Sequence, residues 1–85
     1  MPKLNRAIIL SNIQEAREEL QKIEAMLASD EPLKPVQFQI AMQHAFHHLN
    51  FAWNARHWPM KRYENLSKAD FDLAGSSPTD LAFDD

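Results

Sequence analysis

PVQFQIAMQHAFHHLNFAWNA, residues 35–55, contains no Asp, Glu, Lys or Arg, although 25% of the whole chain is charged. At about 100° per residue, most of its apolar side chains fall on one broad stripe. The stripe consists of Phe38, Ala41, Met42, Ala45, Phe46, Leu49, Ala52 and Trp53. A solvated flank ordinarily carries Lys and Glu, and no flank of this segment does. The pattern therefore predicts one helix that is covered on more than one side.

The opposite side of this helix predicts a binding surface. Ile40, Phe51 and Trp58 lie there, next to a row of Gln, His and Asn side chains that both donate and accept hydrogen bonds. Such a row suits a helix interface that must be specific without burying charge. The predicted partner-binding residues are Ile40, Gln43, His47, Phe51, Asn54 and Trp58. The alternative is that the C-terminal segment of the same chain covers this patch.

Composition limits the fold class. The chain has 85 residues, one glycine and no cysteine, so disulfides, thiolate nucleophiles and Cys-type zinc sites are excluded. Few β-branched residues and many Ala, Leu, Gln, Glu and Met predict an all-α protein. A chain of this length is near the lower limit for a self-sufficient core, which makes oligomerisation a natural way to gain stability.

A first helix is predicted from about Leu4 to Ala28. Its apolar positions are spaced 4, 3, 4, 3 and 4 residues apart, which is a heptad pattern. They are Ile9, Ile13, Ala16, Leu20, Ile23 and Leu27. The other side is charged, so this helix needs one apolar partner. A capping box of Ser11 with Gln14 marks an alternative, later start.

Two prolines in the segment 30–35 predict a short connection, so the two long helices should run antiparallel as a hairpin over residues 1–63. In this hairpin the heptad residues of the first helix would meet the broad stripe of the second. We further expect two hairpins to complete a four-helix bundle as a homodimer, with the charge-free helix central.

The C-terminal segment 64–85 is acidic, with one Lys and six Asp or Glu. The preceding Trp58-Pro59 pair predicts the end of the second helix, followed at 60–65 by a turn or a kinked continuation. A capping box of Ser67 with Asp70 predicts a short helix over 67–74, closed by Gly75 at the C′ position.

A second start signal spans residues 77–80, ahead of Leu81, Ala82 and Phe83. Five apolar residues of the segment are candidates for docking on the hairpin, and Asp84 and Asp85 are expected in solvent. The five are Leu66, Phe71, Leu73, Leu81 and Phe83.

The histidines indicate metal binding as an alternative function. His44 and His48 are four residues apart and share a helix face, where two imidazoles can chelate a divalent ion with a carboxylate as third ligand. There is no Glu-x-x-His or His-Glu-x-x-His motif. The simpler interpretation is that both side chains bond to neighbours at the edge of the core.

Basic residues interspersed with aromatic ones indicate nucleic-acid binding as a second alternative function. Arg56, Lys61 and Arg62 stand among Trp53, Trp58 and Tyr63, an arrangement that phosphate contact with base stacking would use. Three cations are few for a nucleic acid, however. The structural interpretation is that Lys61 and Arg62 pair with the acidic tail and that Arg56 lies over Trp53.

The sequence predicts no catalytic residues and no cofactor. One glycine excludes a Gly-rich phosphate loop, and all the serines have cap or turn explanations. No stretch approaches the roughly 20 apolar residues that span a bilayer, and the apolar run 7–10 is too short for a signal peptide. We therefore expect a small, non-enzymatic, cytoplasmic protein that binds itself or a protein partner; a small-molecule ligand is neither indicated nor excluded.

Overall fold

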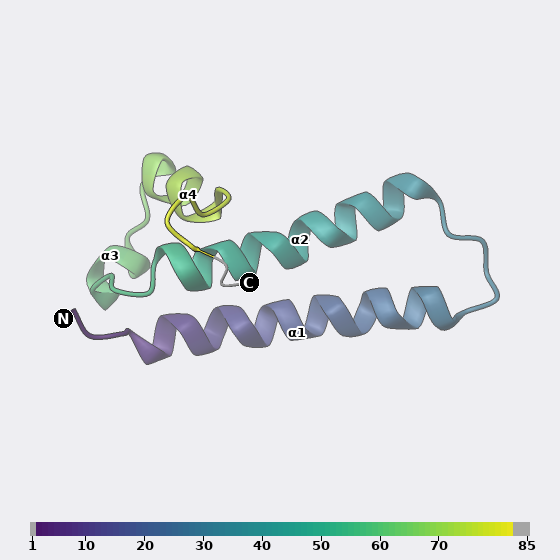
Figure 1. Ribbon diagram of the computed structural model, residues 1–85, viewed down its shortest axis with the longest axis horizontal. Helices are drawn as coiled ribbons and strands as arrows, with labels where there is room; N and C mark the ends of the chain where they lie inside the picture. The colour runs from purple at the N-terminus through teal and green to yellow at the C-terminus, as the bar shows by residue number, and fades with distance from the viewer. Residues whose placement is uncertain (1, 83–85) are drawn as a thin grey trace.

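The computed structural model describes residues 2–82, and in that range the chain forms four helices and no strand. They are α1 (Arg6–Ala28), α2 (Pro35–Asn54), α3 (Met60–Glu64) and α4 (Lys68–Gly75). For residues 2–82, the all-α prediction is confirmed. The long helices α1 and α2 lie side by side and run in opposite directions, while α3 and α4 gather at the end where α1 begins and α2 ends (Figure 1).

The first helix begins at Arg6, two residues after the predicted start. Asn5 is its N-cap, and the Asn5 side chain accepts a hydrogen bond from the backbone N–H of Ile8 at 3.3 Å. Asparagine is among the best N-cap residues, because its oxygen satisfies an N–H that has no partner inside the helix. The alternative start at Ser11 is wrong, since Ser11 lies inside α1.

The buried side of α1 differs from the predicted heptad stripe. Ala16 and Ile23 are buried as expected, but the other buried positions are Ile8 and Asn12, and Ile9 is only half-buried. The remaining predicted positions are exposed, namely Ile13, Leu20 and Leu27. The reason is that α1 has two neighbours: Ile8 belongs to a cluster with residues of the C-terminal part, and Asn12 bonds to Tyr63. The helix is therefore rotated toward the side where α3 and α4 lie.

The second helix begins at Pro35 as predicted, but it ends at Asn54, four residues before the predicted end at Trp58. Pro35 occupies its first turn, and the Gln37 side chain accepts a hydrogen bond from the N–H of Lys34. After Asn54 the chain turns through residues 55–57, and Pro59 is the N-cap of α3, which is a separate helix. Although α2 carries no charge, no helix within residues 2–82 is both long and apolar enough to cross a bilayer.

The last helix begins as predicted, because the Ser67 side chain accepts a hydrogen bond from the N–H of Asp70 at 3.0 Å. Its end differs from the prediction. Gly75 is the final helical residue and does not adopt positive φ, so it is not a left-handed C′ residue. A Cβ at Gly75 would lie 3.0 Å from Nδ1 of His47 and 3.1 Å from its Cε1. Glycine is therefore needed here for the close approach of α4 to α2.

One apolar cluster joins the C-terminal part to the two long helices. It consists of Ile8, Phe51, Ala55, Trp58 and Ala74, with Tyr63 packed against it. Asn5, which precedes α1, is bonded to the same region. The backbone N–H of Asn5 donates to the carbonyl of Arg56 at 2.6 Å, and its side-chain amide donates to the carbonyl of Trp58 at 2.8 Å.

The predicted helix start at residues 77–80 is wrong. The chain is irregular from Ser76 to Ala82, and the Asp80 carboxylate instead accepts hydrogen bonds from Nε1 of Trp53 at 2.8 Å and from Arg56 at 3.3 Å. A side chain that bonds to another helix is not available to cap its own. The expectations for Phe83, Asp84 and Asp85 fall outside the described residues.

Candidate functional site

A broad apolar surface runs along both long helices on one side of their contact, and we call it the open face. On each helix, this surface is rotated about the helix axis by roughly 60–100° from the side that faces the other helix. The rotation has the same direction on both helices, namely that in which successive residues advance. Because α1 and α2 are antiparallel, the two stripes lie on the same side of the pair. The open face consists of Ile9, Ile13, Leu20 and Leu27 on α1 and Phe38, Met42, Phe46 and Leu49 on α2.

Large side chains of the open face are unusually exposed. Leu27 is 63% exposed, Phe46 is 55% exposed and Leu20 is 47% exposed. Single exposed apolar residues are normal on a protein surface, but a contiguous apolar surface along two helices marks an interaction site. Helix α4 packs on a different side of α2. Of the described residues after α4, Asp80 reaches one end of this surface, where it bonds to Trp53 and Arg56.

A shallow groove opens at one end of the open face. It has a volume of about 310 Å³ and is lined almost entirely by apolar groups from both helices. The lining residues are Leu4, Ile9, Ile13, Leu49, Ala52, Trp53 and Arg56. The groove shows directly that the apolar stripes of α1 and α2 meet on one side of the pair.

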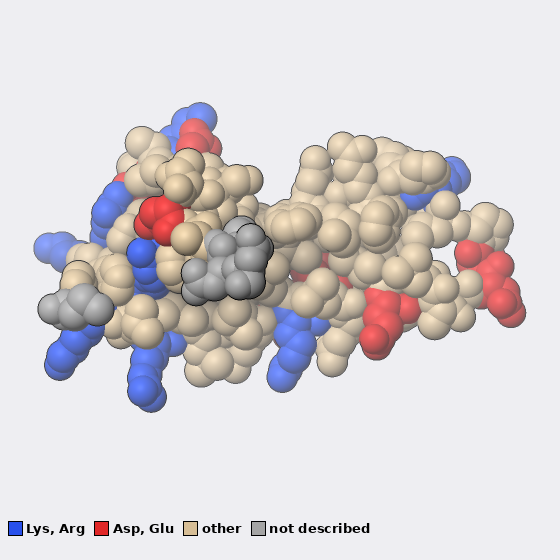
Figure 2. Space-filling model, viewed as in Figure 1, with Lys and Arg blue, Asp and Glu red and all other residues tan. Residues whose placement is uncertain are grey.

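The two long helices differ in their charged residues. Figure 2 shows a wide uncharged area over α2, with Lys, Arg, Asp and Glu confined to the edges and to the other elements. At the α1 edge of the open face, Arg17 and Glu24 are exposed, seven residues apart and of opposite sign. Neither forms an ion pair with another residue in the range 2–82.

A different side of α2 is covered by α4, and the contact combines hydrogen bonds with the packing of Phe71 and Ala74 near Phe51. The Asn50 side chain donates to the carbonyl of Gly75 at 2.9 Å. The Asn54 amide donates to the carbonyls of Ala74 and Ser76 at 3.0 and 2.8 Å. Carbonyls at the end of a helix have no partner inside the helix. The asparagines of α2 therefore cap the C-terminus of α4, which explains why this side of α2 is polar but uncharged.

His47 lies against the same contact. Its ring packs on Phe51 and Phe71, with ring centroids 4.9 and 5.0 Å away. Burial lowers the pKa of His47 below its usual value, and the nearby His48 and His44 lower it further. The neutral imidazole is therefore the favoured form beside Gly75.

The structure does not bring the six predicted partner-binding residues together on one exposed surface. Phe51 and Trp58 are buried in the chain's own cluster, with 3% and 8% exposure. His47 and Asn54 contact the end of α4. Ile40 and Gln43 remain exposed, and α4 packs farther along α2. The alternative that the C-terminal segment covers this patch therefore describes the observed arrangement.

The two histidines of the metal hypothesis have other neighbours. Nδ1 of His48 lies 3.2 Å from Oδ1 of the buried Asn12, whose amide also donates to the carbonyl of Ile8 and to the Tyr63 hydroxyl. Nδ1 of His44 lies 3.9 Å from a carboxylate oxygen of Glu19. Within residues 2–82, no group of three or more His, Cys, Asp or Glu side chains is arranged to hold a metal ion.

The cations of the nucleic-acid hypothesis lie largely on the chain itself. The guanidinium of Arg56 lies 3.8 Å from the ring centroid of Trp53, as predicted, and that of Arg62 lies 3.8 Å from the ring of Trp58. Arg62 also pairs with Asp70 at 2.7 Å, which lowers the pKa of that carboxyl group. Lys61 is exposed and forms no ion pair with another residue in the range 2–82.

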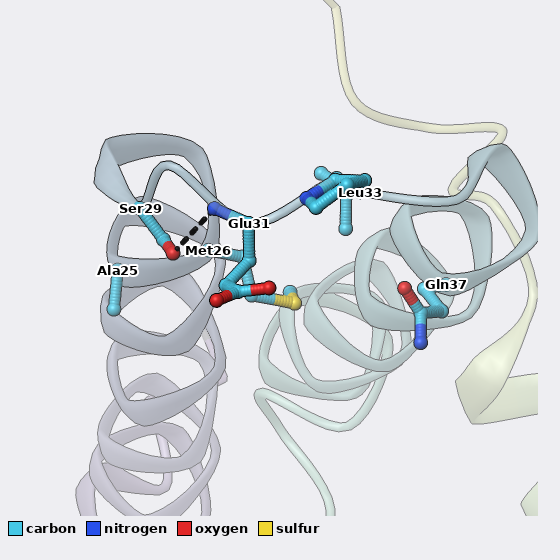
Figure 3. A pocket seen from close by; sticks show the side chains of 7 residues that line it. Ala25, Met26, Ser29, Glu31, Leu33 and Gln37 are labelled. Carbon is cyan, nitrogen blue, oxygen red and sulfur yellow. Dashed lines mark hydrogen bonds between the residues drawn. The ribbon is translucent and has the colours of Figure 1, made fainter.

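A larger hollow, of about 540 Å³, lies beneath the connection between α1 and α2. Figure 3 shows Met26, Glu31, Leu33 and Gln37 around it, and the Ser29 hydroxyl accepting a hydrogen bond from the N–H of Glu31 at 3.0 Å. Glu31 is the single charged residue of its lining. This hollow offers little chemistry compared with the open face, which remains the stronger candidate for binding.

No protein-family model matches the chain, and the comparisons with curated proteins and with solved structures find no match either. The candidate site therefore depends on geometry alone. The heptad pattern places Ile13, Leu20 and Leu27 in the contact between the helices, so it does not predict the open face. One feature of the sequence does indicate such a surface. The apolar residues of α2 span a wider arc of the helix than one neighbouring helix can cover.

We expect the Trp53 indole N–H resonance to titrate with a midpoint below 3.8, the ordinary pKa of an aspartate. The hydrogen bond from Trp53, and then that from Arg56, lower the pKa of Asp80. Because the pKa in the folded state is the lower one, this contact stabilises the fold fully above the ordinary value and is lost as pH falls through the folded value.

Two-dimensional NMR of the two tryptophan indoles follows this titration, with Trp58 as internal reference. The Asp80→Asn variant should abolish the response of Trp53 in this pH range. A midpoint at or above the ordinary aspartate value would contradict the contact.

Proposed function

We propose that this protein is a non-enzymatic interaction protein that associates with a second copy of itself through the open face, completing a four-helix bundle. The observation that carries the proposal is the exposure of large apolar side chains along both helices on that one side. Burying such surface is the main driving force of protein association.

The dimensions of the open face fit a stable dimer. A helix of the length of α2 extends about 30 Å, and two adjacent helices are about 20 Å wide. With the relief of the side chains, such a face approaches the roughly 800 Å² that each partner buries in a standard interface. Two such layers stacked face to face have the architecture of a four-helix bundle.

The absence of charge on α2 supports the same conclusion. A helix that has one neighbour on each of two sides has little surface left for Lys and Glu. In the monomer α1 covers one side of α2 and α4 covers another. A second copy on the open face would account for the side that carries Phe38, Met42, Phe46 and Leu49.

We expect the wild-type protein to be a dimer of twice 9.8 kDa, and the Leu20→Glu variant to be a monomer. A carboxylate at this position would be buried without a partner, which costs about 3–5 kcal/mol and weakens association by more than about a hundredfold. The control is Ile40→Glu, because Ile40 is 48% exposed against 47% for Leu20 but lies off the open face. Light scattering behind a sizing column measures both masses.

Circular dichroism should show that both variants remain helical. A monomeric wild-type protein at micromolar concentration would overturn the proposal. If Ile40→Glu dissociated the dimer while Leu20→Glu did not, association would instead use the exposed part of the surface predicted from the sequence.

A further inference from the structure

If two copies associate through the open face, the apolar residues of α1 give the first indication of their relative orientation. Ile13, Leu20 and Leu27 follow one another at intervals of seven residues, or roughly 10 Å along the helix axis. If α1 of a second copy runs antiparallel with Leu20 at the centre, Leu20 meets its own copy and Ile13 meets Leu27. The pattern is therefore symmetric about Leu20.

From this symmetry and the charges beside it, we propose that the dimer has a two-fold axis near Leu20, with α1 packed antiparallel on α1 of the second copy. This inference rests on the proposed self-association and specifies its geometry.

The charges at the α1 edge of the open face fit the same axis. Arg17 and Glu24 lie four residues after Ile13 and Leu20 respectively, so both lie along the same edge. Their midpoint lies within one residue of Leu20. The antiparallel arrangement places each Arg17 beside Glu24 of the other copy, twice per dimer. A parallel arrangement of the two α1 helices would place Arg17 beside Arg17 and Glu24 beside Glu24.

The register between the long helices extends the symmetry to α2. Asn12 lies opposite His48 and Glu19 lies opposite His44, so Leu20 is level with the middle of α2, close to Met42. Phe38 and Phe46 stand four residues to either side of Met42. The same two-fold axis therefore places Met42 on Met42 and Phe38 on Phe46 of the second copy.

A third geometry, with the axis along the bundle, would stack α1 on α2 of the second copy. In that arrangement Arg17 and Glu24 would face a helix without charge. Exchanging their charges would then leave the dimer dissociation constant unchanged. The ionic dependence of dimerisation therefore separates the geometries. It does so without changing an apolar residue of the interface.

The test is a charge exchange, with the dimer dissociation constant measured by analytical ultracentrifugation at low salt. Arg17→Glu and Glu24→Arg should each weaken dimerisation by about tenfold, since each replaces two attractive pairs with two repulsive ones. The double variant should return the dissociation constant to within about twofold of wild type. High salt should reduce the effect of each single variant, because salt screens exposed charges.

Matched controls change the same charges on the far side of α1. Lys22→Glu and Glu18→Arg should leave the dissociation constant within about twofold of wild type, since neither residue borders the open face. A wild-type dimer that ignores Arg17→Glu, or a double variant that stays weak, would overturn the antiparallel geometry and leave the proposed self-association standing. A wild-type monomer would overturn both.

Discussion

Phe51→Ala is expected to destabilise the protein by about 3–5 kcal/mol, which is the usual cost of removing a buried phenylalanine ring. Phe51 is 3% exposed and belongs to the cluster that joins α1, α2 and α4. Small domains are stable by only about 5–15 kcal/mol in total. The variant should therefore lie near its unfolding transition already at room temperature, and the C-terminal part should lose its contact with α2.

Urea unfolding at one fixed protein concentration, followed by circular dichroism, measures this loss. The matched control is Phe71→Ala, which removes the same ring from a neighbouring position that is 48% exposed. Phe71 packs on His47 and Phe51 from the outside, and its truncation should cost only about 1 kcal/mol. Equal losses for the two variants would show that Phe51 is not in the core.

Trp58→Ala is the second change with a large expected effect, again about 3–5 kcal/mol. The indole is 8% exposed, and the guanidinium of Arg62 lies 3.8 Å from its ring centroid. Truncation would leave a cavity in the cluster, and the cation would lose the ring that it covers. Tyr63 packs against the cluster that contains Trp58, so the packing of Tyr63 should weaken as well.

Trp58→Phe is the informative comparison, because phenylalanine keeps an aromatic face for Arg62 and most of the buried volume. It should recover more than half of the lost stability, as measured by the same urea experiment. If alanine and phenylalanine at this position were equally destabilising, neither the ring nor its volume would explain the effect. The Tyr63 resonances in NMR spectra report separately whether α3 stays in place.

Two helix starts could be predicted from the sequence, because each has a local chemical cause. Pro35 predicts the start of α2 and Ser67 predicts the start of α4. By contrast, α1 begins two residues after its predicted start, and α2 ends at Asn54 rather than at Trp58. Two contacts were also predicted from residue types alone: Arg56 over Trp53, and Arg62 with the acidic segment.

The rotation of α1 could not be predicted, because it depends on where the C-terminal part packs. Ile8 and Ile9 are adjacent and equally apolar, so a heptad count selects between them by assuming a single neighbouring helix. The apolar cluster that holds Ile8 together with Trp58 and Ala74 decides which of the two is buried, and it joins residues far apart in sequence. A rotation that buries Ile8 also turns Leu20 outward, so the open face was missed for the same reason.

Gly75 shows a similar limit. A glycine after a short helix predicts a left-handed C-terminal residue, because that is the commonest use of glycine there. Close approach to another helix requires the same residue type, and the sequence does not distinguish the two uses. The neighbouring His47 ring, 28 residues earlier in the chain, gives no local signal.

The bonds from Asn5 to the carbonyls of Arg56 and Trp58 have a consequence for the order of folding. They connect positions up to 53 residues apart, whereas contacts near the connection between α1 and α2 close short loops. Closing a short loop costs less conformational entropy than closing a long one. The contacts between α1 and α2 should therefore form first near the connection and last near Asn5. Interactions that form after the transition state govern the rate of unfolding rather than the rate of folding. The hydrogen bonds of Asn5 would then slow unfolding of the native state and have little influence on the rate of folding.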